Sequence, residues 1–239
     1  MNRVMLTAIA SLGIAQAASA APVTFFGVNT SPSATVTGDP VTERGNFLNA
    51  LSGSVGTEDF EGFARGTSNP LSLSFTGSTG NITATLSGGG SDIDTAGSGR
   101  FATSGTQFVE TSGGGDFTID FSTAISAFGF YGTDIGDISG DLILTLTDTS
   151  SAETEFTLST GGDPNGSLLF WGFADTMNSY TKIEFTNTGS GDIFGFDDMT
   201  IGDAGQVILP PPPAPVPLPA SSLLLLAGLG GFGLMKRRS

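Results

Sequence analysis

The chain contains no cysteine and no histidine, and these two absences exclude much of protein chemistry. Without cysteine there is no disulfide, no thiol nucleophile and no thiolate ligand. Without histidine the usual zinc sites and a Ser-His-Asp triad are excluded as well. Any bound metal is therefore expected to be a hard cation held by oxygen atoms, and calcium is the natural candidate for a cofactor.

Positive charge is also scarce, with 8 lysine and arginine residues against 23 aspartate and glutamate residues. Four of the basic residues lie near the chain ends. Residues 21–209 keep Arg44, Arg65, Arg100 and Lys182 together with all 23 acidic residues, which gives a net charge near −19. Such a surface repels the phosphate backbone of nucleic acids and attracts divalent cations. The composition therefore excludes nucleic acid as a partner.

The first twenty residues have the three parts of a secretory signal peptide. Arg3 supplies the positive start, residues 4–14 are apolar, and Ala18-Ser19-Ala20 is a small-residue cleavage site. The apolar part is too short to span a bilayer. We therefore expect residues 1–20 to direct export and then to be removed.

The C-terminal end combines a stiff spacer, a short apolar segment and a basic stop. Proline dominates residues 210–220, which are expected to be extended, and residues 221–235 carry no charge. As a helix, the apolar segment would reach roughly 22 Å, whereas the hydrocarbon core of a bilayer is about 30 Å thick. The basic cluster of residues 236–239 is expected to stay cytoplasmic; it contains Lys236, Arg237 and Arg238. This order favours a removable signal over a permanent anchor.

The motif Val216-Pro217-Leu218-Pro219-Ala220, followed by that apolar helix and basic cluster, resembles the PEP-CTERM class of exosortase sorting signals in its VPLPA variant. Leu218 stands where the commoner motif has glutamate. The resemblance implies export through the secretion machinery, transient anchoring in the inner membrane, and recognition by an exosortase. It further implies removal of the tail and delivery to the cell surface or to an extracellular exopolysaccharide matrix.

Between the two signals, residues 21–209 are long enough for one domain with a hydrophobic core. Short runs of alternating polarity predict strands; for example, Leu142, Leu144 and Leu146 would share one face. Strands are expected at residues 23–28, 59–63, 71–76, 81–87, 108–111, 116–122, 125–131, 141–147, 153–159, 168–174, 180–187 and 192–201, and a helix at 42–51. The pattern predicts an all-β fold, an antiparallel two-sheet sandwich of jelly-roll type with one short peripheral helix. A closed barrel is the alternative.

Acidic residues in one loop form a first candidate calcium site. Asp134, Asp137 and Asp141 lie between two predicted strands, separated by glycines that relieve the backbone. Three carboxylates in a short loop supply the oxygen ligands that calcium prefers, although their spacing differs from that of an EF-hand. A solvated loop without metal is the alternative interpretation.

A second candidate calcium site combines residues from the two ends of the domain. Glu61 lies near its start, and Asp197 and Asp198 lie near its end. First and last strands are often neighbours in sandwiches, so Glu61 and one of the aspartates are expected to share an ion. Because side chains alternate along a strand, Asp197 and Asp198 are expected to point to opposite faces.

Tyr131 is the candidate for stacking on a sugar ring, because it follows an apolar strand and precedes Gly132. Trp171 lies in a run that is apolar on both faces, so we expect it in the core. The sequence favours a non-catalytic exported surface or matrix protein with polysaccharide or calcium as its ligand. The alternatives are a structural adhesin or filament subunit assembling through strand edges, and a carboxylate-based glycan-active enzyme.

Overall fold

The computed structural model describes residues 21–31, 34–112, 117–138, 140–189 and 191–209, which belong to one compact unit. The predicted signal peptide, the proline-rich spacer of 210–220, the apolar segment of 221–235 and the basic cluster lie outside the described residues. Among the described residues, no helix has the length and apolar character needed to cross a membrane.

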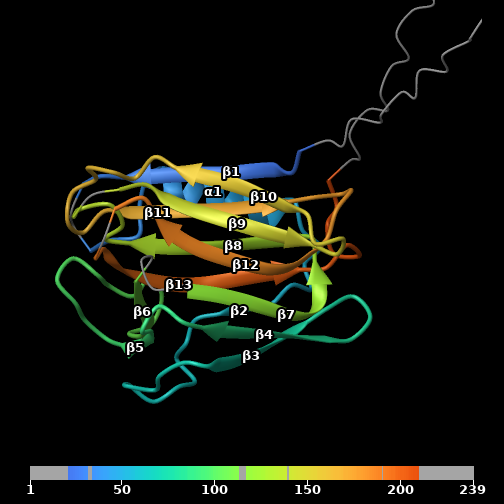
Figure 1. Cartoon of the computed structure of the whole chain (residues 1–239), viewed down its shortest axis with the longest axis horizontal. Helices are drawn as coiled ribbons and strands as arrows, with labels where there is room; N and C mark the ends of the chain where they lie inside the picture. Colours follow the sequence, from blue (N-terminus) through green and yellow to red (C-terminus); the bar gives the residue numbers. More distant parts are fainter. Residues whose placement is uncertain (1–20, 32–33, 113–116, 139, 190, 210–239) are drawn as a thin grey trace, which may run out of the picture. The chain divides into compact units, whose positions relative to one another are not determined.

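The described residues form two antiparallel sheets that lie face to face (Figure 1). The first sheet contains, in spatial order, β1 (Val23–Asn29), β11 (Leu168–Ala174), β8 (Ala127–Thr133), β13 (Ile193–Gly202), β6 (Phe108–Ser112) and β5 (Asp92–Asp94), with β2 (Thr57–Glu58) paired to β13. The second sheet contains β10 (Glu153–Leu158), β9 (Leu142–Asp148), β12 (Tyr180–Asn187), β7 (Phe117–Ile125), β4 (Asn81–Ser87) and β3 (Leu71–Thr76). The predicted all-β sandwich with antiparallel sheets is therefore confirmed.

The main core lies between the two sheets. In the second sheet, apolar residues alternate with polar ones along each strand, and the apolar side chains face this core. Leu142, Leu144 and Leu146 of β9 are all fully buried, as their spacing predicts. The first sheet contributes mainly aromatic rings: Phe130 and Phe196 stack with their centroids 4.9 Å apart. Offset and edge-to-face contacts of this kind add stability beyond the area that the rings bury.

Helix α1 (Asp39–Asn49) covers the other face of the first sheet. Its Phe47 is fully buried and packs against Phe25 of β1 and Phe170 of β11, at centroid distances of 5.7 and 5.6 Å. The helix begins three residues earlier than predicted, because Pro40 occupies its first turn, where a missing N–H costs nothing. This second apolar cluster explains why β8 and β11 are buried along their whole length.

The strand predicted at residues 59–63 is wrong. The structure instead forms the short strand β2 just before it, and the chain then turns. Phe60 adopts a left-handed backbone conformation with φ of 59°, and the Phe63 N–H donates to the Phe60 carbonyl at 3.2 Å. An extended strand cannot contain such a turn. The short strand β5 was not predicted at all.

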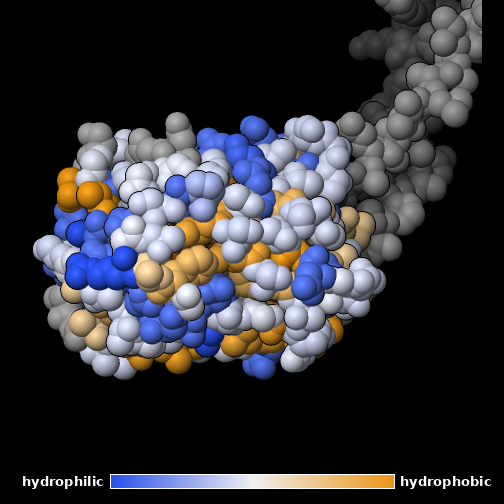
Figure 2. All heavy atoms as spheres, turned by 90° about the horizontal axis from the view of Figure 1, so that it is seen from below, coloured by the Kyte–Doolittle hydropathy of each residue, from blue (hydrophilic) through white to orange (hydrophobic). Residues whose placement is uncertain are grey.

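Each sheet ends in an edge strand at the top and at the bottom of the sandwich, and the edge strands of the two sheets lie close to each other there. In Figure 1, β1 and β10 run along the top, and β3 and β5 lie at the bottom. Seen from below, apolar residues appear as a band between polar surfaces (Figure 2). The inward side chains Leu71, Leu73 and Phe75 of edge strand β3 remain only 2–3% exposed. The core thus extends to this edge of the sandwich and is largely closed there.

The close approach of α1 to β1 depends on Gly27. A Cβ atom at this position would lie 2.6 Å from the backbone carbonyl of Asp39 and 2.8 Å from the Pro40 nitrogen. We expect Gly27→Ala to displace the helix and to lower the free energy of unfolding by about 1–3 kcal/mol. Gly45→Ala is the matched control, since nothing lies within 4 Å of its Cβ. In mid-helix, that alanine should add up to about 1 kcal/mol. Urea unfolding measures both, and equal effects of the two variants would contradict this packing.

Candidate functional site

Four loops meet at one end of the sandwich, on the left in Figure 1: β5–β6, β8–β9, β10–β11 and β12–β13. Polar contacts tie them to one another. Asn165 of the β10–β11 loop donates to the Ser98 hydroxyl at 3.3 Å and to the Asp137 carboxylate at 3.4 Å. The Gly136 N–H donates to Asp192 at 2.7 Å. We refer to this region as the loop end.

A pocket of about 420 Å³ opens at the loop end. Its lining comes from the β5–β6 loop, the β10–β11 loop and the segment after β1, namely Gly97, Gly99, Arg100, Phe101, Asn165, Gly166 and Ala34. The lining combines a guanidinium group, a side-chain amide and an aromatic ring with main-chain groups of glycine. We call it the loop-end pocket.

Arg100 is held firmly beside this pocket. Its Nε donates to Glu110 at 2.8 Å and its Nη1 to Asp134 at 3.4 Å, and its side chain is 17% exposed. Asp134 also accepts the Gly166 N–H at 2.8 Å. Burial raises the pKa of Asp134, whereas the Gly166 N–H and Arg100 oppose the shift. Asp134 therefore serves as a counter-ion and as an acceptor that fixes the β10–β11 loop.

The three carboxylates predicted as one calcium site have different partners. Asp134 faces Arg100, Asp137 accepts from Asn165, and Asp141 accepts the Gly161 N–H at 3.0 Å. Across the described residues, no group of three or more acidic side chains is arranged to hold a metal ion by itself. The loop is thus organised mainly by hydrogen bonds to its neighbours.

Asp197 and Asp198 lie on the same face of the first sheet, contrary to the expectation that they point to opposite faces. The pairing of β13 with β8 shifts register between Asp197 and Thr200, and Asp198 has a φ of 50°. This bulge breaks the alternation of side chains. Both carboxylates accept hydrogen bonds from the β5–β6 loop. Thr103 donates its N–H to Asp197 at 2.6 Å, and its hydroxyl lies within hydrogen-bonding distance of both carboxylates. Ser104 donates its hydroxyl to Asp198 at 2.9 Å.

Glu61 binds the same loop a few residues further along. Its carboxylate accepts the N–H groups of Thr106 and Gln107, both at 2.6 Å, and these bonds lower its pKa. Glu61 and the two aspartates therefore bind one segment, the β5–β6 loop, and the predicted shared ion stays a prediction. Their oxygens accept hydrogen bonds from the β5–β6 loop, and they do not form a common ligand set among the described residues.

Neither candidate aromatic residue offers an exposed ring. Tyr131 is 3% exposed, with the Arg44 guanidinium 5.6 Å from its ring centroid and Phe170 at 5.4 Å. A ring covered in this way cannot stack on a sugar, so the geometry does not support Tyr131 as a platform. Trp171 is 1% exposed and packs against Phe156 at 5.4 Å, which places it in the core as expected.

Sequence reasoning missed the residues that line the loop-end pocket. In the sequence, Arg100 stands out only as one of four basic residues in residues 21–209, after a glycine-rich stretch. Asn165 and Phe101 carried no signal of their own. Asp192 stands at the start of a predicted strand, and its neighbours in the sequence give no indication that it is fully buried.

No protein-family model matches the chain, and no curated protein matches it. Solved structures with a similar arrangement include the K2 cleaved adhesin domain of Lys-gingipain, at a TM-score of 0.40 and 15% identity over 63% of this chain and 98% of that one. A DUF4465 family protein from Bacteroides ovatus gives a TM-score of 0.35 and 11% identity over 62% of this chain and 98% of that one. TmCBM61 in complex with β-1,4-galactotriose gives a TM-score of 0.28 and 15% identity over 49% of this chain and 86% of that one.

The Asp197–Asp198 pair predicts a dependence of stability on pH. Burial, and next the charge of Asp198, raise the pKa of Asp197 to about 7. In the unfolded chain Asp197 loses its proton near pH 4, whereas the folded chain keeps it until about pH 7. Stability due to this group therefore falls as the pH rises from about 4 to 7.

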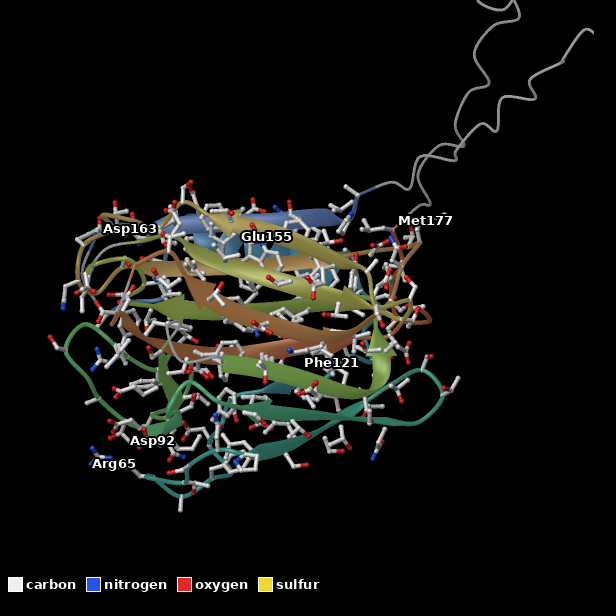
Figure 3. All side chains as sticks on the ribbon, in the orientation of Figure 1. Arg65, Asp92, Phe121, Glu155, Asp163 and Met177 are labelled. Atoms are coloured by element: carbon white, nitrogen blue, oxygen red, sulfur yellow. The ribbon has the colours of Figure 1, made fainter. Side chains whose placement is uncertain are left out.

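Asp197→Asn should remove this loss, because the amide carries no charge. We expect the stability of the variant relative to the wild type to increase by on the order of 3 kcal/mol between pH 4 and pH 7.5. Urea unfolding at several pH values in this window measures the difference. Glu155→Gln, at an exposed position on β10 (Figure 3), is the control. Parallel pH profiles for wild type and Asp197→Asn would refute the assignment.

Proposed function

We propose that this chain is a non-catalytic, exported protein of the cell surface or extracellular matrix, delivered by an exosortase-type system, that binds polysaccharide at the loop-end pocket. The sorting part of the proposal is carried by the Val216–Ala220 motif with the apolar segment and basic cluster behind it. In this proposal, residues 221–235 hold the chain in the inner membrane until the exosortase removes the tail. The binding part is carried by the chemistry of the pocket.

The lining of the loop-end pocket suits a sugar. Its volume lies in the range typical of small-ligand sites, about 300–1,000 Å³. The Asn165 amide and the Arg100 guanidinium offer hydrogen-bond donors for hydroxyl groups, and the amide also offers an acceptor. The half-buried ring of Phe101 gives an apolar surface for the carbon face of a pyranose. Because the domain is strongly acidic, a neutral glycan fits better than an anionic one.

The hydrogen bonds of the acidic residues support a non-catalytic role over the glycosidase alternative. A glycosidase needs two carboxylates facing a substrate cleft at a defined separation. Asp197 and Asp198 are 1% and 6% exposed and accept hydrogen bonds from Thr103 and Ser104. Both are thus buried and hydrogen-bonded to the β5–β6 loop, whereas a catalytic pair must be open to its substrate.

A structural role through strand edges is the second candidate function, and the edge strand β1 favours it. This strand carries no charged residue, and its Val23 and Phe26 are 48% and 41% exposed. A groove of about 310 Å³ lies beside it, lined in part by Phe26, Phe156 and Trp171. Unpaired, uncharged edge strands are sites where a strand of another chain can add.

Removing the pocket's polar and aromatic groups tests polysaccharide binding. We expect Asn165→Ala and Phe101→Ala each to weaken binding of neutral glycans on an array by about tenfold or more, as the loss of one hydrogen bond or one stacking ring implies. Asn46→Ala, at an exposed position on α1, is the control. Unchanged binding in both pocket variants contradicts the site. An absence of glycan binding, together with concentration-dependent polymers that Phe26→Lys abolishes, would instead establish the structural role.

The mass of the surface-exposed protein tests the sorting proposal. We expect the mature form to lack residues 1–20 and the segment after about Pro219, because an exosortase would remove the tail. Intact-mass measurement on protein released from the cell surface detects both changes. Replacing Pro217 and Pro219 by alanine should leave the tail in place and the protein in the membrane. The same replacements at Pro211 and Pro213, outside the motif, are the control. Surface protein that retains Lys236–Ser239 refutes processing.

A further inference from the structure

Asp192 is the most unusual ionisable residue of the loop end. It lies just before β13 and is fully buried. Its Oδ2 accepts the Gly136 N–H at 2.7 Å and a long contact of 3.5 Å from the Asn187 amide. Its Oδ1 has no hydrogen-bond partner, although it is shielded from solvent. A buried carboxylate oxygen left bare costs several kcal/mol, so this atom needs a proton or a cation.

A second carboxyl group, that of Asp137, faces Asp192 and cannot supply a hydrogen bond to the bare oxygen while both groups are ionised. Asp137 lies within hydrogen-bonding reach of Asp192, but two ionised carboxylates can only accept. Burial, opposed in part by the Gly136 N–H, and then the charges of Asp137 and Asp134 raise the pKa of Asp192 to about 6. At neutral pH, negative charge therefore accumulates at this point of the loop end.

Arg100, the basic residue of the loop end, already forms ion pairs with other carboxylates. Arg100 pairs with Glu110 and Asp134 and donates to the Ile193 carbonyl at 3.5 Å, and among the described residues no ion pair joins it to Asp192. The Oδ2 atom of Asp163, in the neighbouring β10–β11 loop, is also buried without a partner. Figure 3 shows Asp163 at the same end of the sandwich. Its loop is tied to the Asp137 loop by a hydrogen bond from the Gly162 N–H to the Gly136 carbonyl at 3.0 Å.

We propose that Asp137 and Asp192 together bind a divalent cation of the calcium class at the loop end. Calcium fits better than a transition metal, because the chain offers only oxygen ligands here and has neither cysteine nor histidine. Calcium also tolerates irregular coordination, whereas magnesium demands a near-ideal octahedron. The site uses Asp192, which the sequence did not single out, and leaves Asp134 to Arg100. It does not depend on the polysaccharide proposal.

The remaining ligands must come from main-chain carbonyls, amide oxygens or water, since no group of three acidic side chains is preformed among the described residues. Two carboxylates with neutral ligands are typical of weak extracellular calcium sites, with dissociation constants of about 0.1–1 mM. The ion would neutralise the repulsion between Asp137 and Asp192. It would also hold the β8–β9 loop against the β12–β13 loop.

Thermal melting of the full chain with calcium tests this site. After chelation and at pH 7.5, we expect 10 mM CaCl2 to raise the Tm of the wild type by about 3–6 °C, and 10 mM MgCl2 to raise it less. Isothermal titration should give one calcium per chain. Asp192→Asn and Asp137→Asn should each abolish the calcium-dependent rise. Asp120→Asn, at an exposed position on β7, should keep it.

Asp192→Asn also keeps the test decisive if other variants fold poorly. The amide has the shape of the carboxylate without its charge, so in calcium-free buffer we expect this variant to melt at or above the wild-type temperature. A wild type that shows no shift in 10 mM CaCl2 would overturn the proposal, because a proton on Asp192 would then suffice. A full shift in Asp192→Asn, or a shift lost only in Asp197→Asn, would overturn it as well by placing the ion elsewhere.

Discussion

Strands β8, β11 and β13 are buried on both faces, and the rest of the structure depends on how each face is covered. The second sheet covers one face with an apolar core. Helix α1 covers part of the other face, and its Phe47 ring can approach the strands because Gly129 has no side chain: a Cβ there would lie 2.8 Å from the ring. This two-sided burial draws Tyr131 and Trp171 into packing. Neither ring is therefore available for stacking on a ligand.

Beyond α1, the outer face of the first sheet is covered by a polar segment, the β5–β6 loop. A polar cover requires that buried donors and acceptors find partners. Asp197 and Asp198 supply acceptors for Thr103 and Ser104, and Glu61 supplies them for Thr106 and Gln107. Three of the 23 acidic residues thus fasten one loop. Among the described residues, Asp192 and Asp163 differ from these carboxylates, because each has a buried oxygen without a hydrogen-bond partner.

The strands of the second sheet could be predicted from the sequence, because one of their faces is polar and the alternation is visible. Residues 71–76 and 81–87 match β3 and β4 without error. The predictions fail where the alternation of polar and apolar residues does not reveal the backbone conformation. A bulge at Asp198 reverses the direction of one side chain, and a left-handed residue at Phe60 turns the chain out of a predicted strand. Two-sided burial removes the alternation that would have shown which face of β8 holds Tyr131.

The candidate site was harder to predict than the fold, because it depends on loops that are distant in the sequence. Arg100, Asn165 and Asp192 come together only when the β5–β6, β10–β11 and β12–β13 loops converge. The same convergence links the two proposed sites. Asn165 lines the loop-end pocket and donates to Asp137, which in turn faces Asp192. A cation between Asp137 and Asp192 would fix the partner that orients Asn165. Cation binding and ligand binding at this end of the sandwich would then be coupled through a single side-chain amide.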